Sequence, residues 1–268
     1  MTDREIYPNA PLRFVAFEAR FPHVPPFGLA VPPEPLRKAL QARFPRSEPA
    51  NVQSVEIGPG AIRQGAEMRH RFLSRDRTIA LTLGAQSLSV ETANYHRFED
   101  FRESIAEAVD AVEALAEVSG LLRVGLRYVD ELRVPVAISA LAEWAAYVDG
   151  SLIGPVGLAP GSPVQSFGAI ETQIAERQGL AMRYGSLPHG RLVDPNGPLR
   201  SPHNDPDDEP FFFIDIDSYW TAPEDDMPEF VTQAILGICN DLHSPTRTMF
   251  ESSITEKLRN DVLRTQGE

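Results

Sequence analysis

The chain has 268 residues, of which 42% are hydrophobic, and it carries a formal net charge of -13 and one cysteine. A chain of this length can bury a large core in one or two domains, which excludes disorder throughout. One cysteine excludes an internal disulfide and any multi-cysteine metal site, and the acidic balance argues against direct binding of nucleic acid. No apolar run reaches the roughly 18 residues of a membrane span. The N-terminus lacks the pattern of a signal peptide, so we expect a cytoplasmic protein without membrane contact.

The first half of the chain predicts a strand, a short helix, four strands and a long helix. Residues 12–21 alternate apolar and mixed side chains, which is the period of a half-buried strand. Residues 34–44 space their apolar side chains as a helix does. Residues 98–118 repeat apolar side chains every three or four positions, which predicts a long helix with one stripe on the sheet. Between these helices, turn residues separate four strands of an antiparallel meander, at 52–57, 68–73, 78–83 and 88–93.

The same order of elements returns in the second half. A strand is expected at 122–132 and a helix at 139–148. Three strands follow at 167–175, 180–184 and 211–217, then two helices at 228–242 and 245–263. Two local matches, of residues 12–14 with 122–124 and of 90–95 with 214–219, favour a tandem duplication over chance similarity. We therefore expect an α+β fold of two pseudo-repeats, residues 1–120 and 121–268, each with a strand, a helix, antiparallel strands and a long helix.

Four separated motifs resemble a known set. They are Tyr7-x-Asn9-Ala10-Pro11-Leu12, LSVETANYHRF at 88–98, RVGLRY at 123–128, and Leu242-His243 followed by Phe250 and Ile254-Thr255. In this order they resemble the sporadically distributed bacterial family of unknown function, whose members have about this length. The resemblance implies a bacterial, soluble protein with an accessory role, for example in mobile or defence-related gene neighbourhoods. It implies no activity, cofactor or catalytic residue.

Charged residues gather on one face of the strand at 122–132. Guanidinium groups on a rigid strand can grip a carboxylate or phosphate bidentately, with a carboxylate nearby. Alternatively, arginine and acid pairs join the two repeats, because unpaired charge near a sheet core is costly. The candidates for this anion site, or for these inter-repeat ion pairs, are Arg123, Arg127, Arg133, Glu91 and Asp215.

Other candidate motifs favour structural roles. The glycine-rich segment 58–65 has the wrong spacing for a dinucleotide loop and precedes a strand, so we expect a turn. His70 lies on an apolar strand face and is expected in the core, as is Cys239 on a helix. His243 precedes Ser244-Pro245, which predicts a helix junction. One loop is dense in possible metal ligands, but their spacing matches no metal motif, so a flexible, solvated loop without metal is expected: His189, Asp194, His203, Asp205, Asp207 and Asp208.

Acidic residues concentrate between 205 and 229, where ten occur without a lysine or arginine. Such a patch can speed and direct the docking of a basic partner, although charge runs usually keep a surface solvated. We therefore expect a non-catalytic interaction protein or accessory subunit, such as an antitoxin, immunity protein or defence-associated scaffold, without a cofactor. The partner-binding candidates are Asp207, Asp208, Glu209, Glu224, Asp225 and Asp226. The alternatives are a metal-assisted hydrolase and a small-ligand-binding protein whose pocket is lined by Phe14, Phe17, Phe72 and Phe212.

Overall fold

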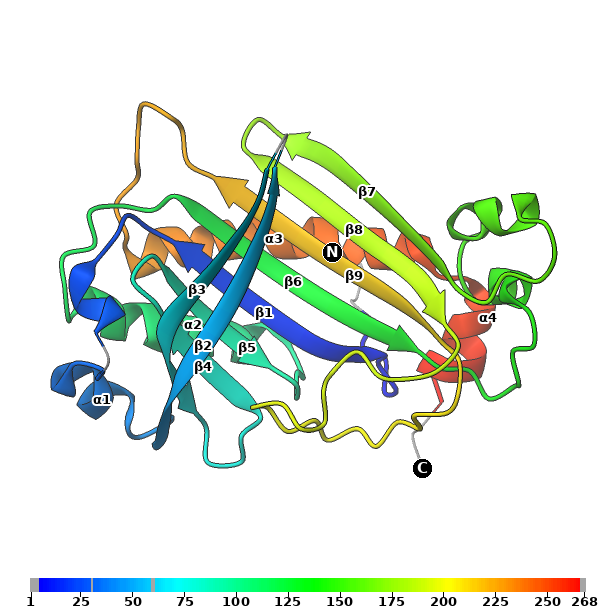
Figure 1. Ribbon diagram of the computed structural model, residues 1–268, viewed down its shortest axis with the longest axis horizontal. Helices are drawn as coiled ribbons and strands as arrows, with labels where there is room; N and C mark the ends of the chain where they lie inside the picture. Colours follow the sequence, from blue (N-terminus) through cyan, green and yellow to red (C-terminus); the bar gives the residue numbers. More distant parts are fainter. Residues whose placement is uncertain (1–4, 30, 59–60, 266–268) are drawn as a thin grey trace.

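The computed structural model describes residues 5–29, 31–58 and 61–265. Within these residues, nine strands form one antiparallel sheet in the order β2-β3-β4-β5-β1-β6-β9-β8-β7 (Figure 1). Strand β1 lies at its centre, because it pairs with β5 on one side and with β6 on the other. The strands are β1 (Leu12–Arg20), β2 (Arg46–Gly58), β3 (Ala61–Leu73), β4 (Ile79–Leu83), β5 (Ser87–Thr92), β6 (Arg123–Leu132), β7 (Ser166–Ala175), β8 (Gln178–Leu187) and β9 (Phe211–Thr221).

Two long helices, α2 (Phe98–Glu113) and α3 (Thr232–Ser253), cover one face of the sheet and contact each other. In Figure 1 they lie behind the strands, and the β2-β3 hairpin crosses in front. Alternate residues of β6 therefore face opposite ways: its even-numbered side chains face the helices and its odd-numbered ones the other side. Each large apolar side chain buried beneath the helices contributes about 1.5–3 kcal/mol to folding. None of the helices in the described residues is long and apolar enough to cross a membrane.

The predicted fold of two strand, helix, strands and long-helix repeats is wrong. The strands join in one continuous sheet, because β1 and β6 pair along almost their whole length. The helix predicted at 139–148 is also absent, and short 3-10 turns occupy Leu141–Ala146, Gly150–Leu152 and Gly154–Leu158. Leu141, Trp144 and Tyr147 are buried at every third position of the first turn, which matches three residues per turn and not 3.6. The boundary predicted at residue 120 lies between α2 and β6 and stays a prediction.

The C-terminal third differs from prediction at one further point. The two helices predicted at 228–242 and 245–263 are replaced by the single helix α3, which passes through Pro245. A proline removes one helical hydrogen bond, yet the helix continues because Leu242 and Thr246 on either side are buried against the sheet. Two short elements follow, α4 (Glu256–Leu258) and a π-helical turn (Arg259–Leu263). The predicted meander of β2 to β5 and the helices near 34–44 and 98–118 are confirmed, as α1 (Glu34–Leu40) and α2.

Candidate functional site

The predicted charged face of β6 is present, and its arginines are paired with carboxylates. Arg127 donates bidentately to Asp215 on β9, with N···O distances of 2.7 and 2.8 Å. Arg123 donates to Asp217 at 2.9 Å, and Arg133 pairs with Glu131 at 2.7 Å. These three pairs lie within the second half of the chain, whereas Arg123 also forms an ion pair with Glu18 of β1, in the first half, at 3.6 Å. Whether the arginines also bind an anion stays a prediction.

Glu91 reaches the same region from β5. It lines a cavity of about 370 Å³ together with Arg127 and Asp215, while Arg133 lies outside that cavity. Burial raises the pKa of Glu91, and the positive charges of Arg71, Arg69 and Arg127 oppose the rise. The structure thus brings three of the five predicted residues to one cavity on the face of the sheet opposite α2 and α3.

The loop at 188–210 closes this face and is held down by charged groups. Asp205 accepts two hydrogen bonds from Arg13, at 2.7 and 3.0 Å, and Arg77 donates to the Pro198 carbonyl oxygen at 3.0 Å. Arg133 donates to the Gly190 carbonyl oxygen at 2.7 Å. The loop was predicted to be flexible and solvated, but these hydrogen bonds hold it over the sheet. We call residues 188–210 the cover loop. Among the described residues, no group of three His, Cys, Asp or Glu side chains could hold a metal ion.

The acidic residues between 205 and 229 do not form one patch. Asp207, Asp208 and Glu209 precede β9, whereas Glu224, Asp225 and Asp226 follow it. A strand of 11 residues spans roughly 35 Å, so the two groups lie at opposite ends of β9. Asp207 forms an ion pair with Arg191 of the cover loop.

His70 and three of the phenylalanines proposed to line a pocket are buried, whereas Phe14 is half-buried. His70 is 2% exposed, and desolvation lowers its pKa, which fits a core histidine. Of the four phenylalanines proposed to line one pocket, Phe17 and Phe72 lie beneath α2 and α3, Phe212 lies in a second core cluster, and Phe14 faces the cover loop. They therefore do not line a common pocket. The glycine-rich segment 58–65 belongs to the β2-β3 hairpin, with residues 59 and 60 outside the described part.

Cys239 is fully buried on α3, as predicted, and burial raises the pKa of its thiol to about 12. Only the thiolate reacts readily, so this cysteine is expected to be inert in the folded protein. We expect the aromatic disulfide DTNB to leave the native protein unlabelled during a time in which it fully labels the urea-unfolded protein. Fast labelling of the native protein would show instead that α3 opens readily.

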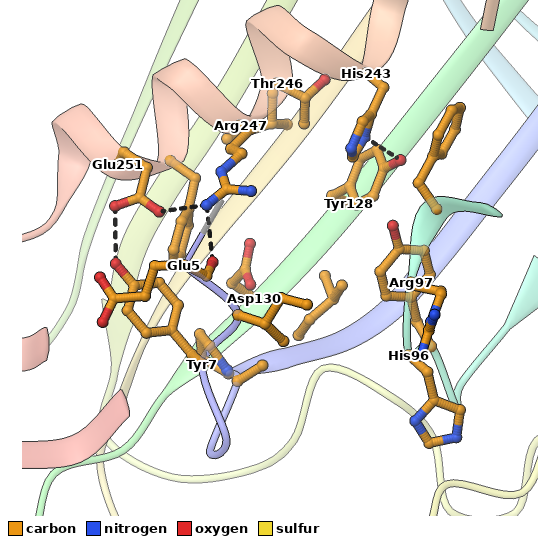
Figure 2. A pocket seen from close by; sticks show the side chains of 18 of the residues that line it. Glu5, Tyr7, His96, Arg97, Tyr128, Asp130, His243, Thr246, Arg247 and Glu251 are labelled. Atoms are coloured by element: carbon orange, nitrogen blue, oxygen red, sulfur yellow. Dashed lines mark hydrogen bonds and ion pairs between the residues drawn. The ribbon is translucent and has the colours of Figure 1, made fainter. Parts of the chain in front are cut away.

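A pocket that the sequence did not predict lies between α3 and the sheet. Its volume is about 270 Å³. Five parts of the chain form it, as Figure 2 shows: the N-terminal segment, the connection from β5 to α2, and β6, β9 and α3. Most of its surface is apolar, and five of its side chains are tyrosines or phenylalanines: Tyr7, Tyr95, Phe98, Tyr128 and Phe250.

Asp130 of β6 is the buried acid of this pocket. It is 5% exposed and occupies an even-numbered position, on the face that Tyr128 and Leu126 share. Among the described residues, none donates a hydrogen bond to its carboxyl group. Burial raises the pKa of Asp130 to about 8, although the positive charge of Arg13 opposes the rise. The cost of desolvating a carboxylate is the physical cause.

One wall of the pocket is a cluster of aromatic side chains around a hydrogen bond between a tyrosine and a histidine. The Tyr128 hydroxyl and Nδ1 of His243 share a hydrogen bond of 3.0 Å (Figure 2). The His243 ring stacks on Phe98, with 4.2 Å between ring centres, and Tyr95 packs edge-on against Tyr128. His243 thus lies in the middle of α3 and not at the predicted helix junction. The stacking fixes the imidazole at the pocket wall.

A set of hydrogen bonds holds the N-terminal segment against α3. Tyr7 donates to Glu251 at 3.0 Å, and Arg259 donates to the same carboxylate at 3.1 Å. Arg247 donates to the carbonyl oxygen of Glu5 at 2.8 Å. The N-terminal segment is thereby held across the pocket as one of its walls.

The motifs that carry the family resemblance converge on this pocket. Tyr7 and Leu12 of the first motif, Tyr95 and Phe98 of the second, and Tyr128 of the third line it. The fourth motif contributes two further lining residues, His243 and Phe250. Comparison with protein-family models, with curated proteins and with solved structures gives no match to this chain. The family membership therefore stays a prediction.

Proposed function

We propose that this protein binds a small ligand with an apolar body in the pocket between α3 and β6. The observation that carries the proposal is Asp130, a buried carboxyl group without a hydrogen-bond donor among the described residues, in a cavity with mostly apolar walls. An apolar pocket with few placed polar groups is the usual form of a ligand site. A buried polar group without a partner is costly, and a ligand that pairs with it relieves that cost.

The size of the pocket limits the ligand. At about 270 Å³ its volume lies just below the usual range of ligand sites, which begins at about 300 Å³. The ligand is therefore of the size of one aromatic ring with a short chain. Docking of a basic protein on the acidic residues is a weaker proposal, since β9 separates the two groups of acids.

The proposal can be tested by mapping where a neutral apolar probe, 3-phenylpropanol, perturbs the amide NMR spectrum. We expect the shifted resonances to belong to pocket residues, among them Tyr95, Tyr128 and Thr246. Thr246→Leu places extra carbon atoms in the cavity and should abolish the shifts, because Thr246 is buried at the pocket wall.

Thr248→Leu is the matched control for that variant. Thr246 and Thr248 lie on the same helix, and each hydroxyl donates to the carbonyl oxygen four residues earlier, at 3.0 and 3.2 Å. Thr248 is exposed, so its replacement should leave probe binding unchanged. Shifts scattered over the protein, or shifts that persist in Thr246→Leu, would contradict the proposed function.

A further inference from the structure

We propose that the ligand carries a cationic amine and that its ammonium group pairs with the Asp130 carboxylate inside the pocket. This inference rests on the proposed function and names the chemical class of the ligand. It predicts that the pocket binds an amine more tightly than a neutral alcohol or a carboxylate of the same shape.

The first argument is the pairing of charges around the pocket. Both arginines of the pocket wall have partners. Nε of Arg97 lies 3.6 Å from a carboxylate oxygen of Asp100. Arg247 donates a hydrogen bond to the Glu5 carbonyl oxygen, and its guanidinium lies 4.0 Å from a carboxylate oxygen of Glu251. Of the other lining acids, Glu5 and Glu251 are paired with Arg264 and Arg259, and Glu99 is exposed to solvent. Asp130 is the buried lining acid that lacks such a partner among the described residues. A cationic group on the ligand would therefore supply the counter-charge that Asp130 lacks.

The aromatic walls are the second argument. A cation within about 6 Å of a tyrosine or phenylalanine ring gains about 0.5–2 kcal/mol from the negative face of the ring. Tyr95 packs against Tyr128, and Phe98 stacks on His243, which is hydrogen-bonded to Tyr128, so these rings form one cluster in the pocket wall. An ammonium group at Asp130 would thus pair with the carboxylate in the same pocket as the Tyr128 ring, which lies two positions away on the same face of β6. A ligand carboxylate would instead meet the acid, because both lining arginines are already engaged.

Several titratable and charged groups face Asp130 or its pocket. Burial is the main cause of its raised pKa, about 8, while Asp215 adds to the rise and Arg13 opposes it, both across the sheet. The other ionisable groups of the pocket wall are Glu5, Tyr7, Tyr95, His96, Arg97, Glu99, Tyr128, His243, Arg247 and Glu251. The contribution of Asp130 is therefore isolated by substitution.

The acid is mostly protonated at pH 7, so binding of an ammonium group must release its proton. Below the pKa of about 8, affinity for the amine follows the ionised fraction of Asp130 and rises about nine-fold from pH 6 to pH 7. From pH 7 to pH 8 the rise is about five-fold. A neutral ligand shows no such dependence.

The test is titration calorimetry with three probes that share one shape: 3-phenylpropylamine, 3-phenylpropanol and 3-phenylpropionate. At pH 8 we expect the amine to bind at least about ten-fold more tightly than the alcohol, as a charge-assisted pair requires. At pH 7, titrations in two buffers of different ionisation enthalpy should show release of about 0.9 proton with the amine. The alcohol should release none.

Asp130→Asn should abolish both the preference for the amine and the proton release, while binding of 3-phenylpropanol persists and shows that the variant is folded. Asp217→Asn is the matched control. Asp217 is an acid of β9 with a pKa raised by burial, but it pairs with Arg123 and does not line this pocket.

The outcomes separate the two proposals. If none of the three probes binds, the proposed function itself fails. If the alcohol binds as tightly as the amine, or the carboxylate binds most tightly, the pocket binds ligands but the assignment of an amine is wrong. Proton release that survives in Asp130→Asn would also overturn it, because another group of the wall would then titrate.

Discussion

Replacement of Glu131 by alanine is expected to lower the free energy of unfolding by about 3–4 kcal/mol. Glu131 is 1% exposed, and its carboxylate pairs with Arg133 at 2.7 Å and accepts the backbone N–H of Leu192 at 2.9 Å. Without it, a guanidinium that is only 12% exposed loses its counter-charge, and a backbone donor loses its acceptor. Urea unfolding measures the loss.

The same change should loosen the cover loop at 188–210, because Arg133 also holds the Gly190 carbonyl oxygen. We expect trypsin to cleave the loop faster in Glu131→Ala than in the wild type. Glu176→Ala, at a side chain that is 88% exposed, is the control and should change stability by less than about 0.5 kcal/mol. A similarly small effect of Glu131→Ala would mean that the loop is not held by this carboxylate.

Local patterns were enough to predict the strands and helices that bury one face. The alternation at 12–21 and the helical spacing at 98–118 each report burial of one side, and a strand was also expected at 122–132, so β1, α2 and β6 were predicted correctly. The arrangement of these elements was not, because the pairing of β1 with β6 joins residues more than 100 positions apart. No local period encodes that contact. The sequence therefore predicted two units where one sheet exists.

The errors at 139–148 and at Pro245 have the same origin. In both places the helix pattern is short or interrupted, and contacts with distant residues decide the outcome. Leu141 and Trp144 pack into the cluster around Phe212, which favours a tight 3-10 turn, while burial of Leu242 and Thr246 carries α3 through the proline. Tertiary packing thus overrides local propensity at these positions.

The candidate pocket was missed although one signal for it is present in the sequence. Along β6, the buried positions Val124, Leu126 and Tyr128 lead directly to Asp130. A carboxyl group in register with the buried apolar side chains of a strand is an exception that points to a site. The arginines on the opposite face are more conspicuous, yet the structure shows each of them with a carboxylate. The remaining walls come from distant segments and could not be placed by pattern.

Asp130 is also expected to make the folded protein less stable as the pH rises. Its pKa is about 8 in the folded protein and 3.8 when unperturbed, so the folded state holds a proton that the unfolded state has lost. A raised carboxyl pKa therefore lowers stability from about pH 4 up to about pH 8, by about 1.4 kcal/mol per pH unit. Above pH 8 both states are ionised and the effect is constant.

Asp130→Asn isolates this contribution, because asparagine is neutral at every pH. We expect the stability of this variant minus that of the wild type to increase by about 3–4 kcal/mol between pH 5 and pH 8 in urea unfolding. Asp217→Asn should give a smaller change, since Arg123 stabilises that carboxylate. A difference between Asp130→Asn and wild type that stays constant with pH would mean that water hydrates the carboxylate. The carboxylate would then need no ligand cation, so this measurement bears on the energetic basis of amine binding without any ligand present.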